Sequence, residues 1–257
     1  PPSTTTTWTW SRRNDGLDLC DGAGRPLHEV AAVTVSIVRF GGSNCDRDAA
    51  LALGSLDIDA EIVWHEDGLP EATDGIVIPG GFSYGDYLRA GAMAARSPIM
   101  ADVRALAEDG VPVLGVCNGA QIGSESGLTP GAFTTNRSAR FQCEHVHLRV
   151  ENADTPWTAA YDEGAVVELP IAHGEGRFEV SDDQLDELEA EDRVLFRYCD
   201  AEGAVTDGAN PNGSKHNVAG VLGERDSVAV LMPHPERAVL PDIGPTDGQG
   251  ILEGFVD

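Results

Sequence analysis

The chain has 257 residues, of which 41% are hydrophobic, and its 43 acidic and 17 basic residues give a formal net charge of −26. This length allows one large α/β domain with a buried core of its own. A surface this acidic repels nucleic acid and anionic membranes, so we expect neither as a partner. No apolar run approaches the roughly 20 residues that span a bilayer.

The charge favours one interpretation over two others. Lys215 is the only lysine and the other sixteen basic residues are arginines. We interpret the acidity as adaptation to high salt, where screening tolerates self-repulsion. An ordinary acidic enzyme is the first alternative. An acidic patch for a basic partner is the second, and the scatter of the acids along the whole chain argues against it.

The cysteines indicate a reducing compartment. Five of them lie far apart, with no C-x-x-C pair, which argues against a zinc ribbon and against a disulfide framework. The N-terminus has no apolar stretch after a basic start, so we see no secretory signal. We therefore expect a cytoplasmic protein.

The start of the chain is unlike the rest. Residues 1–32 open with a threonine run and show neither a helical nor a strand period. We expect this segment to be a flexible extension, or upstream sequence translated ahead of the true start. The fold itself is expected over residues 33–257, beginning with a strand at Val33–Phe40.

Strands and helices alternate after Val33, as in an α/β fold with a mostly parallel central sheet. The expected helices begin near Ser43 or Asn44, at Ser97-Pro98, near Asn118, at Ser181 and at Thr246. The expected strands are 33–40, 61–64, 75–79, 111–116, 144–150, 165–170, 194–198, 218–222 and 227–232.

The sharpest chemical motif is Gly115-Val-Cys-Asn-Gly119, directly after a buried strand and before a helix. Such a turn exposes the reactive atom of a strained nucleophile, and flanking glycines relieve crowding. The helix N-terminus stabilises a thiolate at Cys117, and the N–H of Asn118 points to where an oxyanion would form. Taken alone, the motif fits a buried structural cysteine equally well.

A second motif supplies the other groups that cysteine catalysis needs. Met232-Pro-His-Pro-Glu236 follows the last apolar strand. His234 is the candidate base and Glu236, two residues on, is the group that orients it.

A third motif is Pro79-Gly-Gly-Phe82, also at a strand end. Two glycines allow close backbone approach, so the N–H of Gly81 is a candidate second oxyanion donor, although a plain tight turn is the simpler interpretation. Sites in parallel sheets gather at the carboxyl ends of strands, where all three motifs end.

These motifs resemble the class I (triad) glutamine amidotransferases. Five longer segments resemble more closely the glutaminase subunits of phosphoribosylformylglycinamidine synthase, an enzyme of purine synthesis. These segments are Arg39–Asp46, Pro79–Gly91, Pro170–Gly176, Asn210–Ser214 and Pro233–Ala238. The resemblance runs from about Val33 to the C-terminus. It implies a flavodoxin-like α/β domain that releases ammonia from glutamine.

The resemblance also implies partners. Ammonia would pass to a synthetase subunit that uses ATP and Mg to convert formylglycinamide ribonucleotide to the amidine, and a small third subunit would bridge the two. This chain itself would need no metal and no organic cofactor.

By position, the resemblance makes Cys117 the nucleophile, His234 the base and Glu236 its orienter. Gln121 matches a substrate-contacting position. The loop that closes over glutamine matches His173, Gly174 and Glu175, for which a purely structural role is equally open. Asn44, Tyr84, Asp86 and Arg89 match subunit motifs whose physical roles the sequence does not reveal.

Two kinds of alternative stay open. One is a glutaminase for another synthetase, or a cysteine hydrolase of similar fold. The other is a degenerate domain used only for binding, which predicts the loss of at least one of Cys117, His234 and Glu236; all three are present.

Overall fold

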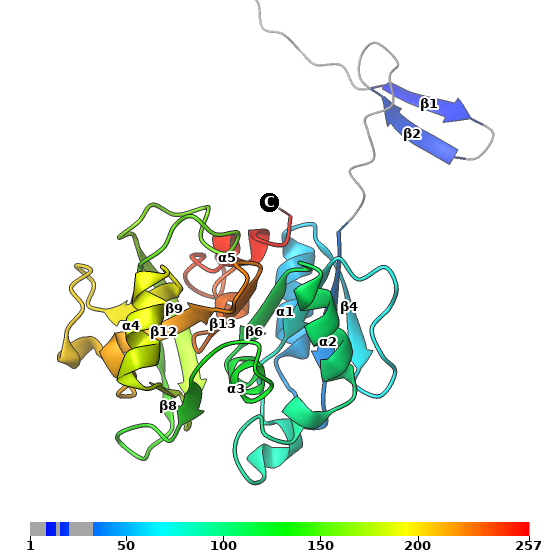
Figure 1. Ribbon diagram of the computed structural model, residues 1–257. Helices are drawn as coiled ribbons and strands as arrows, with labels where there is room; N and C mark the ends of the chain where they lie inside the picture. The colour runs from blue at the N-terminus through cyan, green and yellow to red at the C-terminus, as the bar shows by residue number, and fades with distance from the viewer. Residues whose placement is uncertain (1–8, 14–15, 21–32, 257) are drawn as a thin grey trace, which may run out of the picture. The chain divides into compact units, whose positions relative to one another are not determined.

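The computed structural model describes residues 9–13, 16–20 and 33–256, and the chain divides into two compact units, residues 1–32 and 33–257 (Figure 1). In the first unit, β1 (Thr9–Arg13) and β2 (Gly16–Cys20) pair antiparallel. This hairpin was not predicted from the sequence, because an alternation as short as Leu17-Asp18-Leu19 is a weak strand signal. The rest of residues 1–32, and with it most of the expected extension, lies outside the described residues.

The second unit is built on a nine-stranded sheet in the order β4-β3-β5-β6-β13-β12-β11-β8-β9. Its strands are β3 (Thr34–Arg39), β4 (Asp59–Trp64), β5 (Gly75–Ile78), β6 (Val113–Val116), β8 (Gln142–Val150), β9 (Val166–His173), β11 (Val194–Cys199), β12 (Val218–Leu222) and β13 (Val228–Leu231). Every strand expected from the sequence is present, with bounds that differ by a few residues.

The sheet has two halves. The five strands from β4 to β13 are parallel to one another, whereas β12, β11, β8 and β9 each run antiparallel to the neighbour before them. The α/β class and the parallel core are confirmed. The antiparallel half was not distinguished in the sequence analysis, because direction depends on the path of the connections rather than on strand composition. β7 (Ala132–Thr134) and β10 (Arg177–Glu179) form a separate small sheet.

The α-helices are α1 (Asp46–Ser55), α2 (Ile99–Glu108), α3 (Asn118–Glu125), α4 (Asp182–Ala190) and α5 (Gln249–Glu253). Helices α1 and α2 cover opposite faces of the parallel half, whereas α4 lies beside the antiparallel half, where Arg197 of β11 bonds to Glu189 (Figure 1). All five were expected, but the residue before α1 is Cys45 and its side chain makes no capping bond. Ser181 caps α4 and forms a reciprocal capping box with Gln184. Within the described residues, none of the helices has the length and apolarity needed to cross a membrane.

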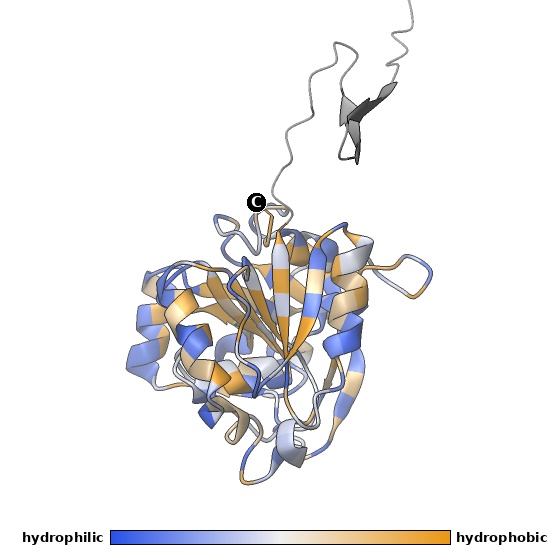
Figure 2. Ribbon diagram, turned by 90° about the vertical axis from the view of Figure 1, so that its right-hand side faces the viewer, coloured by the Kyte–Doolittle hydropathy of each residue, from blue (hydrophilic) through white to orange (hydrophobic). Residues whose placement is uncertain are grey.

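Alternate residues along β3 and β5 point to opposite faces and form two hydrophobic clusters. Ile37 and Val77 pack with Leu53 of α1, whereas Val38 and Ile76 pack with α2 on the other side. Figure 2 shows the hydrophobic residues concentrated along the central strands. This burial on both faces explains why the central strands read as continuous apolar runs.

Candidate active site

Three neighbouring parallel strands end at one edge of the sheet. β5, β6 and β13 are adjacent, with Ile78 paired to Gly115 and Leu231 paired to Val116. Because parallel strands present their carboxyl ends at the same edge, the segments that follow them lie close together. These segments carry Gly80-Gly81, Cys117 and His234, the three motifs identified in the sequence.

Cys117 has a strained backbone between β6 and α3, with φ 52° and ψ −106°. A non-glycine residue in this region costs on the order of 1–3 kcal/mol unless its surroundings hold it there. Its N–H donates to Leu231 O at 2.9 Å. A Cβ at Gly115 would lie 2.7 Å from Gly119 O, and one at Gly119 would overlap the carbonyl oxygen of Ile78. The two flanking glycines are therefore required for strand and helix to approach this closely.

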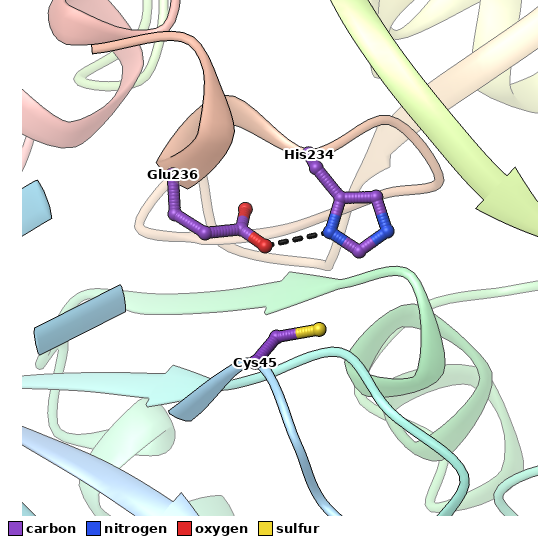
Figure 3. Close-up of side chains that lie close together, drawn as sticks. All are labelled: Cys45, His234 and Glu236. Carbon is purple, nitrogen blue, oxygen red and sulfur yellow. Dashed lines mark hydrogen bonds and ion pairs between the residues drawn. The ribbon is translucent and has the colours of Figure 1, made fainter. Parts of the chain in front are cut away.

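His234 and Glu236 form a buried pair on the segment that follows β13. Their Nδ1 and Oε1 atoms lie 2.6 Å apart, and their side chains are 1% and 3% exposed (Figure 3). Since a carboxylate accepts, His234 Nδ1 carries a proton. Within the described residues, the other ring nitrogen, Nε2, is buried without a hydrogen-bond partner. The predicted base and orienter are thus in the arrangement expected of those roles.

Two opposing effects set the pKa of His234. Burial alone would lower it, but the negative charges of Glu236 and of the Cys117 thiolate outweigh burial and raise the pKa well above its ordinary value. The site therefore favours the imidazolium form of His234.

Gly80 lies where these side chains meet. A Cβ at this position would lie 2.9 Å from His234 Cε1, 3.0 Å from Cys45 Sγ and 3.4 Å from the Cβ of Cys117. The sequence analysis assigned a role to Gly81 and none to its neighbour. The pair of adjacent glycines was the sequence signal for both roles. Gly80 leaves room for the side chains of the site, and Gly81 adopts a φ of 143°.

Cys45 is a second buried thiol beside His234, and it was not singled out in the sequence. Cys45, His234 and Glu236 offer donor atoms within 4.8 Å of one another, which makes them a candidate metal cluster (Figure 3). His234 Nδ1 and Glu236 Oε1 are bonded to each other and Arg237 Nη2 lies 3.1 Å from Cys45 Sγ, whereas His234 Nε2 and Glu236 Oε2 have no partner among the described residues. The guanidinium cation beside Cys45 opposes the binding of a metal cation there.

Two backbone amides near the strand ends have no acceptor among the described residues. Within the described residues, neither the N–H of Gly81 nor that of Asn118 donates to a protein oxygen. The loop that carries Gly81 is held to α3, because Ser83 N donates to Asn118 Oδ1 at 3.0 Å. Gly81 also forms a bridge with Ser43.

The four residues predicted to contact substrate are linked to this centre. Asn118 Nδ2 donates to Gln121 Oε1 at 2.8 Å, and Gln121 Nε2 donates to the carbonyl of Glu175 at 2.7 Å. His173 is the last residue of β9, the strand at the far edge of the sheet. The carbonyl oxygen of its neighbour Ala172 nevertheless lies 3.7 Å from Cys117 Sγ. The antiparallel half of the sheet thus brings the loop from His173 to Gly176 back to the thiol.

Two asparagines hold that loop from both sides, and neither was assigned a site role from the sequence. Asn136 Oδ1 accepts from Gly176 N at 2.9 Å, and Asn212 Nδ2 donates to Gly176 O at 2.8 Å. The segment Asn210–Ser214 was singled out only for its resemblance to the family, which did not indicate this contact. Asn136 had no local signal.

The loop after Gly81 contains strained and titratable residues. Tyr84, Asp86 and Leu88 all have positive φ. Burial, assisted by the nearby charge of Glu175, raises the pKa of Asp86 to about 6. Tyr84 Oη lies 3.1 Å from the Nε2 of His65, one of the contacts that hold the loop to the domain.

Comparisons with known proteins agree with this geometry. Residues 32–246 match the family described as the CobB/CobQ-like glutamine amidotransferase domain. The phosphoribosylformylglycinamidine synthase subunit PurQ of Natronomonas pharaonis is 81% identical over 223 residues, 87% of this chain and 100% of the relative. That of Halobacterium salinarum is 74% identical with the same coverage. A solved structure of PurLQS from Thermotoga maritima contains a chain with 43% identity and a TM-score of 0.77, covering 88% of this chain and 98% of that one.

The fold and the buried Cys-His-Glu group define a glutamine amidotransferase of the class I type. The chain belongs to the CobB/CobQ-like glutamine amidotransferase family and, within it, to the glutaminase subunits of phosphoribosylformylglycinamidine synthase in purine biosynthesis. The resemblance found in the sequence is confirmed. Several of the relatives come from halophilic organisms, which supports salt adaptation as the reason for the acidity.

Proposed function

We propose that the chain hydrolyses glutamine through a glutamyl thioester on Cys117. The observation that carries this proposal is the Cys117, His234 and Glu236 constellation, with its 2.6 Å bond between imidazole and carboxylate at the edge where β5, β6 and β13 end. The thiolate attacks the carboxamide carbon, and His234 gives its proton to the departing ammonia. Water, deprotonated by the same imidazole, then attacks the thioester and releases glutamate.

The tetrahedral oxyanion is assigned to the N–H groups of Gly81 and Asn118. Their lack of a described acceptor supports this role, because an unoccupied buried donor gains most when charge develops beside it. Gln121, His173, Gly174 and Glu175 are proposed to contact the substrate. The bond from Gln121 to the carbonyl of Glu175 supports a shared role for helix and loop.

The ammonia is proposed to pass to a synthetase subunit, which uses ATP and Mg to make phosphoribosylformylglycinamidine, with a small bridging subunit in the assembly. The solved relative titled PurLQS supports an assembly of this kind. A cytoplasmic site of action is part of the proposal, and the described free thiols Cys45, Cys117, Cys143 and Cys199 are consistent with a reducing compartment.

The test is an ammonia-transfer assay with the synthetase subunit, ATP and formylglycinamide ribonucleotide. Wild-type chain is expected to support synthesis from glutamine, and Cys117→Ala to abolish it while synthesis from added ammonia survives. Glutamine-dependent synthesis by Cys117→Ala would remove the thioester route. Cys143→Ala, at an exposed thiol, is the matched control.

Glutamate release also tests coupling to the partner. Cys117 is 5% exposed, and the loop that carries Gly81 has strained residues that can change conformation. The isolated chain is expected to be slow, and assembly to raise kcat by roughly 10²–10³, the usual effect of one oxyanion donor. Equal rates alone and assembled would contradict this coupling.

A further inference from the structure

His173 presents a buried ring nitrogen that the fold leaves unpaired. Its side chain lies at the end of β9 and the residue is 3% exposed. Nδ1 lies 3.1 Å from Asn136 Oδ1, whereas Nε2 has no partner among the described residues. A buried polar atom without a partner is costly, so it points to a group that arrives with a ligand.

The neighbouring amide fixes which nitrogen of His173 carries the proton. Asn136 Nδ2 lies 2.9 Å from the carbonyl oxygens of both Arg140 and His173, so this end of the amide must be the donor. Its Oδ1 therefore faces Gly176 N and His173 Nδ1 as an acceptor. Since an acceptor needs a donor, Nδ1 holds the proton and Nε2 holds a lone pair.

The ring also stays neutral. Burial, reinforced by the positive charge of His234, lowers the pKa of His173 to about 4. The ring lies against Gly176, where a Cβ would overlap its atoms, and its Nδ1 is bonded to Asn136. Near neutral pH, His173 is a fixed hydrogen-bond acceptor that cannot donate through Nε2.

This acceptor belongs to the residue next to the one whose carbonyl lies at the reactive end of the site. Cys117 Sγ is 3.7 Å from the carbonyl of Ala172, the residue before His173, and the charge of His234 acts on the His173 ring. Glutamine offers two N–H groups at this end, on its carboxamide, whereas the glutamate product offers only carboxylate oxygens. A lone pair here attracts the first and repels the second.

We propose that His173 Nε2 accepts a hydrogen bond from the carboxamide N–H of glutamine, and that Asn136 is the positioning residue that holds the ring in this tautomer. The pair selects glutamine over glutamate and helps the product carboxylate to leave. His173 transfers no proton in this role. The inference rests on the proposed glutaminase function.

The binding test uses the Cys117→Ala chain, which cannot turn over, alone and assembled with the synthetase subunit. Calorimetry gives the Kd for glutamine and for glutamate. His173→Leu is expected to lower the preference for glutamine about tenfold or more, the usual effect of one lost hydrogen bond to a buried polar group. His173→Gln, whose amide oxygen can reach the position of Nε2, is expected to restore part of it.

The variant Asn136→Asp tests whether Asn136 sets the tautomer of His173 or only supports the structure of the loop. A carboxylate beside Nδ1 favours the imidazolium, which turns Nε2 into a donor and shifts preference toward glutamate. A merely structural Asn136 would weaken both ligands equally. Thermal melts of each variant show whether it is folded.

The ¹⁵N shifts of His173 at pH 7 provide a second readout without ligand. A protonated Nε2 in the free chain would overturn the inference, as would an unchanged glutamine-to-glutamate ratio in both His173→Leu and Asn136→Asp. If no form of the chain binds glutamine, alone or assembled, the proposed function fails as well. If glutamine binds and the ratio is unchanged, only this inference fails.

Discussion

Glu236 allows the His234 ring to hold a positive charge in a buried setting. An imidazole buried as deeply as His234 would ordinarily be neutral. The carboxylate 2.6 Å away reverses this and also fixes the ring so that Nε2 is the atom available to the substrate. Removing only its charge should therefore change both the protonation and the rate.

Glu236→Gln is expected to lower the pKa of His234, because burial then acts without the opposing charge. Imidazolium would be lost at lower pH than in the wild type, and glutaminase activity should fall by roughly 10²–10⁴, as when the orienting carboxylate of a triad is removed. NMR titration of the His234 ring measures the first effect. Glu224→Gln, at an exposed carboxylate, is the control, and an unchanged His234 titration would contradict the assignment.

At this scale the sequence predicted what is local and missed what is distant. Cys117, His234 and Glu236 each stand in a short motif at a strand end, so their residue types and spacing carried the prediction. Asn136 contacts residues about 40 positions away, and Gly80 is defined by side chains from three elements. No local pattern can report such contacts.

Among the elements, the loop after β5 has several non-glycine residues with positive φ. It combines positive φ at Tyr84, Asp86 and Leu88 with a carboxyl oxygen of Asp86 that is buried and unpartnered within the described residues. Leu88 is 82% exposed. A loop held in this way is suited to change on docking of a partner.

Asp86 should make the stability of the domain depend on pH. Its pKa in the folded chain is raised from 3.8 to about 6 by burial first and Glu175 second, so folding disfavours its charged form. Its contribution to stability is complete below pH 3.8 and is lost as pH rises through about 6. Asp86→Asn should therefore raise Tm at pH 7 more than at pH 4. Melts over this range test it, and an equal shift at both pH values, or the same profile for the exposed control Asp162→Asn, would contradict it.

The nine strands of the large sheet and the five α-helices were predictable from apolar runs, caps and glycines, since those signals are local, whereas the short strands β7 and β10 were not predicted. Strand order was not. The return of β9 to the thiol follows from the antiparallel half, where His234 N donates to Pro170 O at 2.9 Å. The loop from His173 to Gly176 was proposed as a substrate loop only through its resemblance to known sequences.

For the whole molecule, charge is the dominant property. A net charge of −26 produces repulsion that low salt does not screen. Tm should rise with KCl between about 0.1 M, where the screening length is about 10 Å, and molar concentrations, where it is about 3 Å or less. Sucrose, which favours compact states without screening, is the control solute. A melting temperature independent of KCl would count against salt adaptation.

Residues 33–257 are proposed to be the complete glutaminase unit. The relatives of 81% and 74% identity match over 223 residues, their entire length. A chain that starts at Val33 is therefore expected to keep the Tm and the glutaminase rate of the full chain. A large loss of Tm on this truncation would show that residues 1–32 stabilise the domain.

The central claim is that Cys117 is the nucleophile. The site contains two buried thiols, Cys45 and Cys117, and one measurement can decide which of them attacks the substrate. The glutamine analogue 6-diazo-5-oxo-norleucine alkylates the attacking group of glutaminases, and peptide mapping locates the label. We expect one label, on Cys117, lost in Cys117→Ala and retained in Cys45→Ser. A label on Cys45, or labelling that survives Cys117→Ala, would contradict the account.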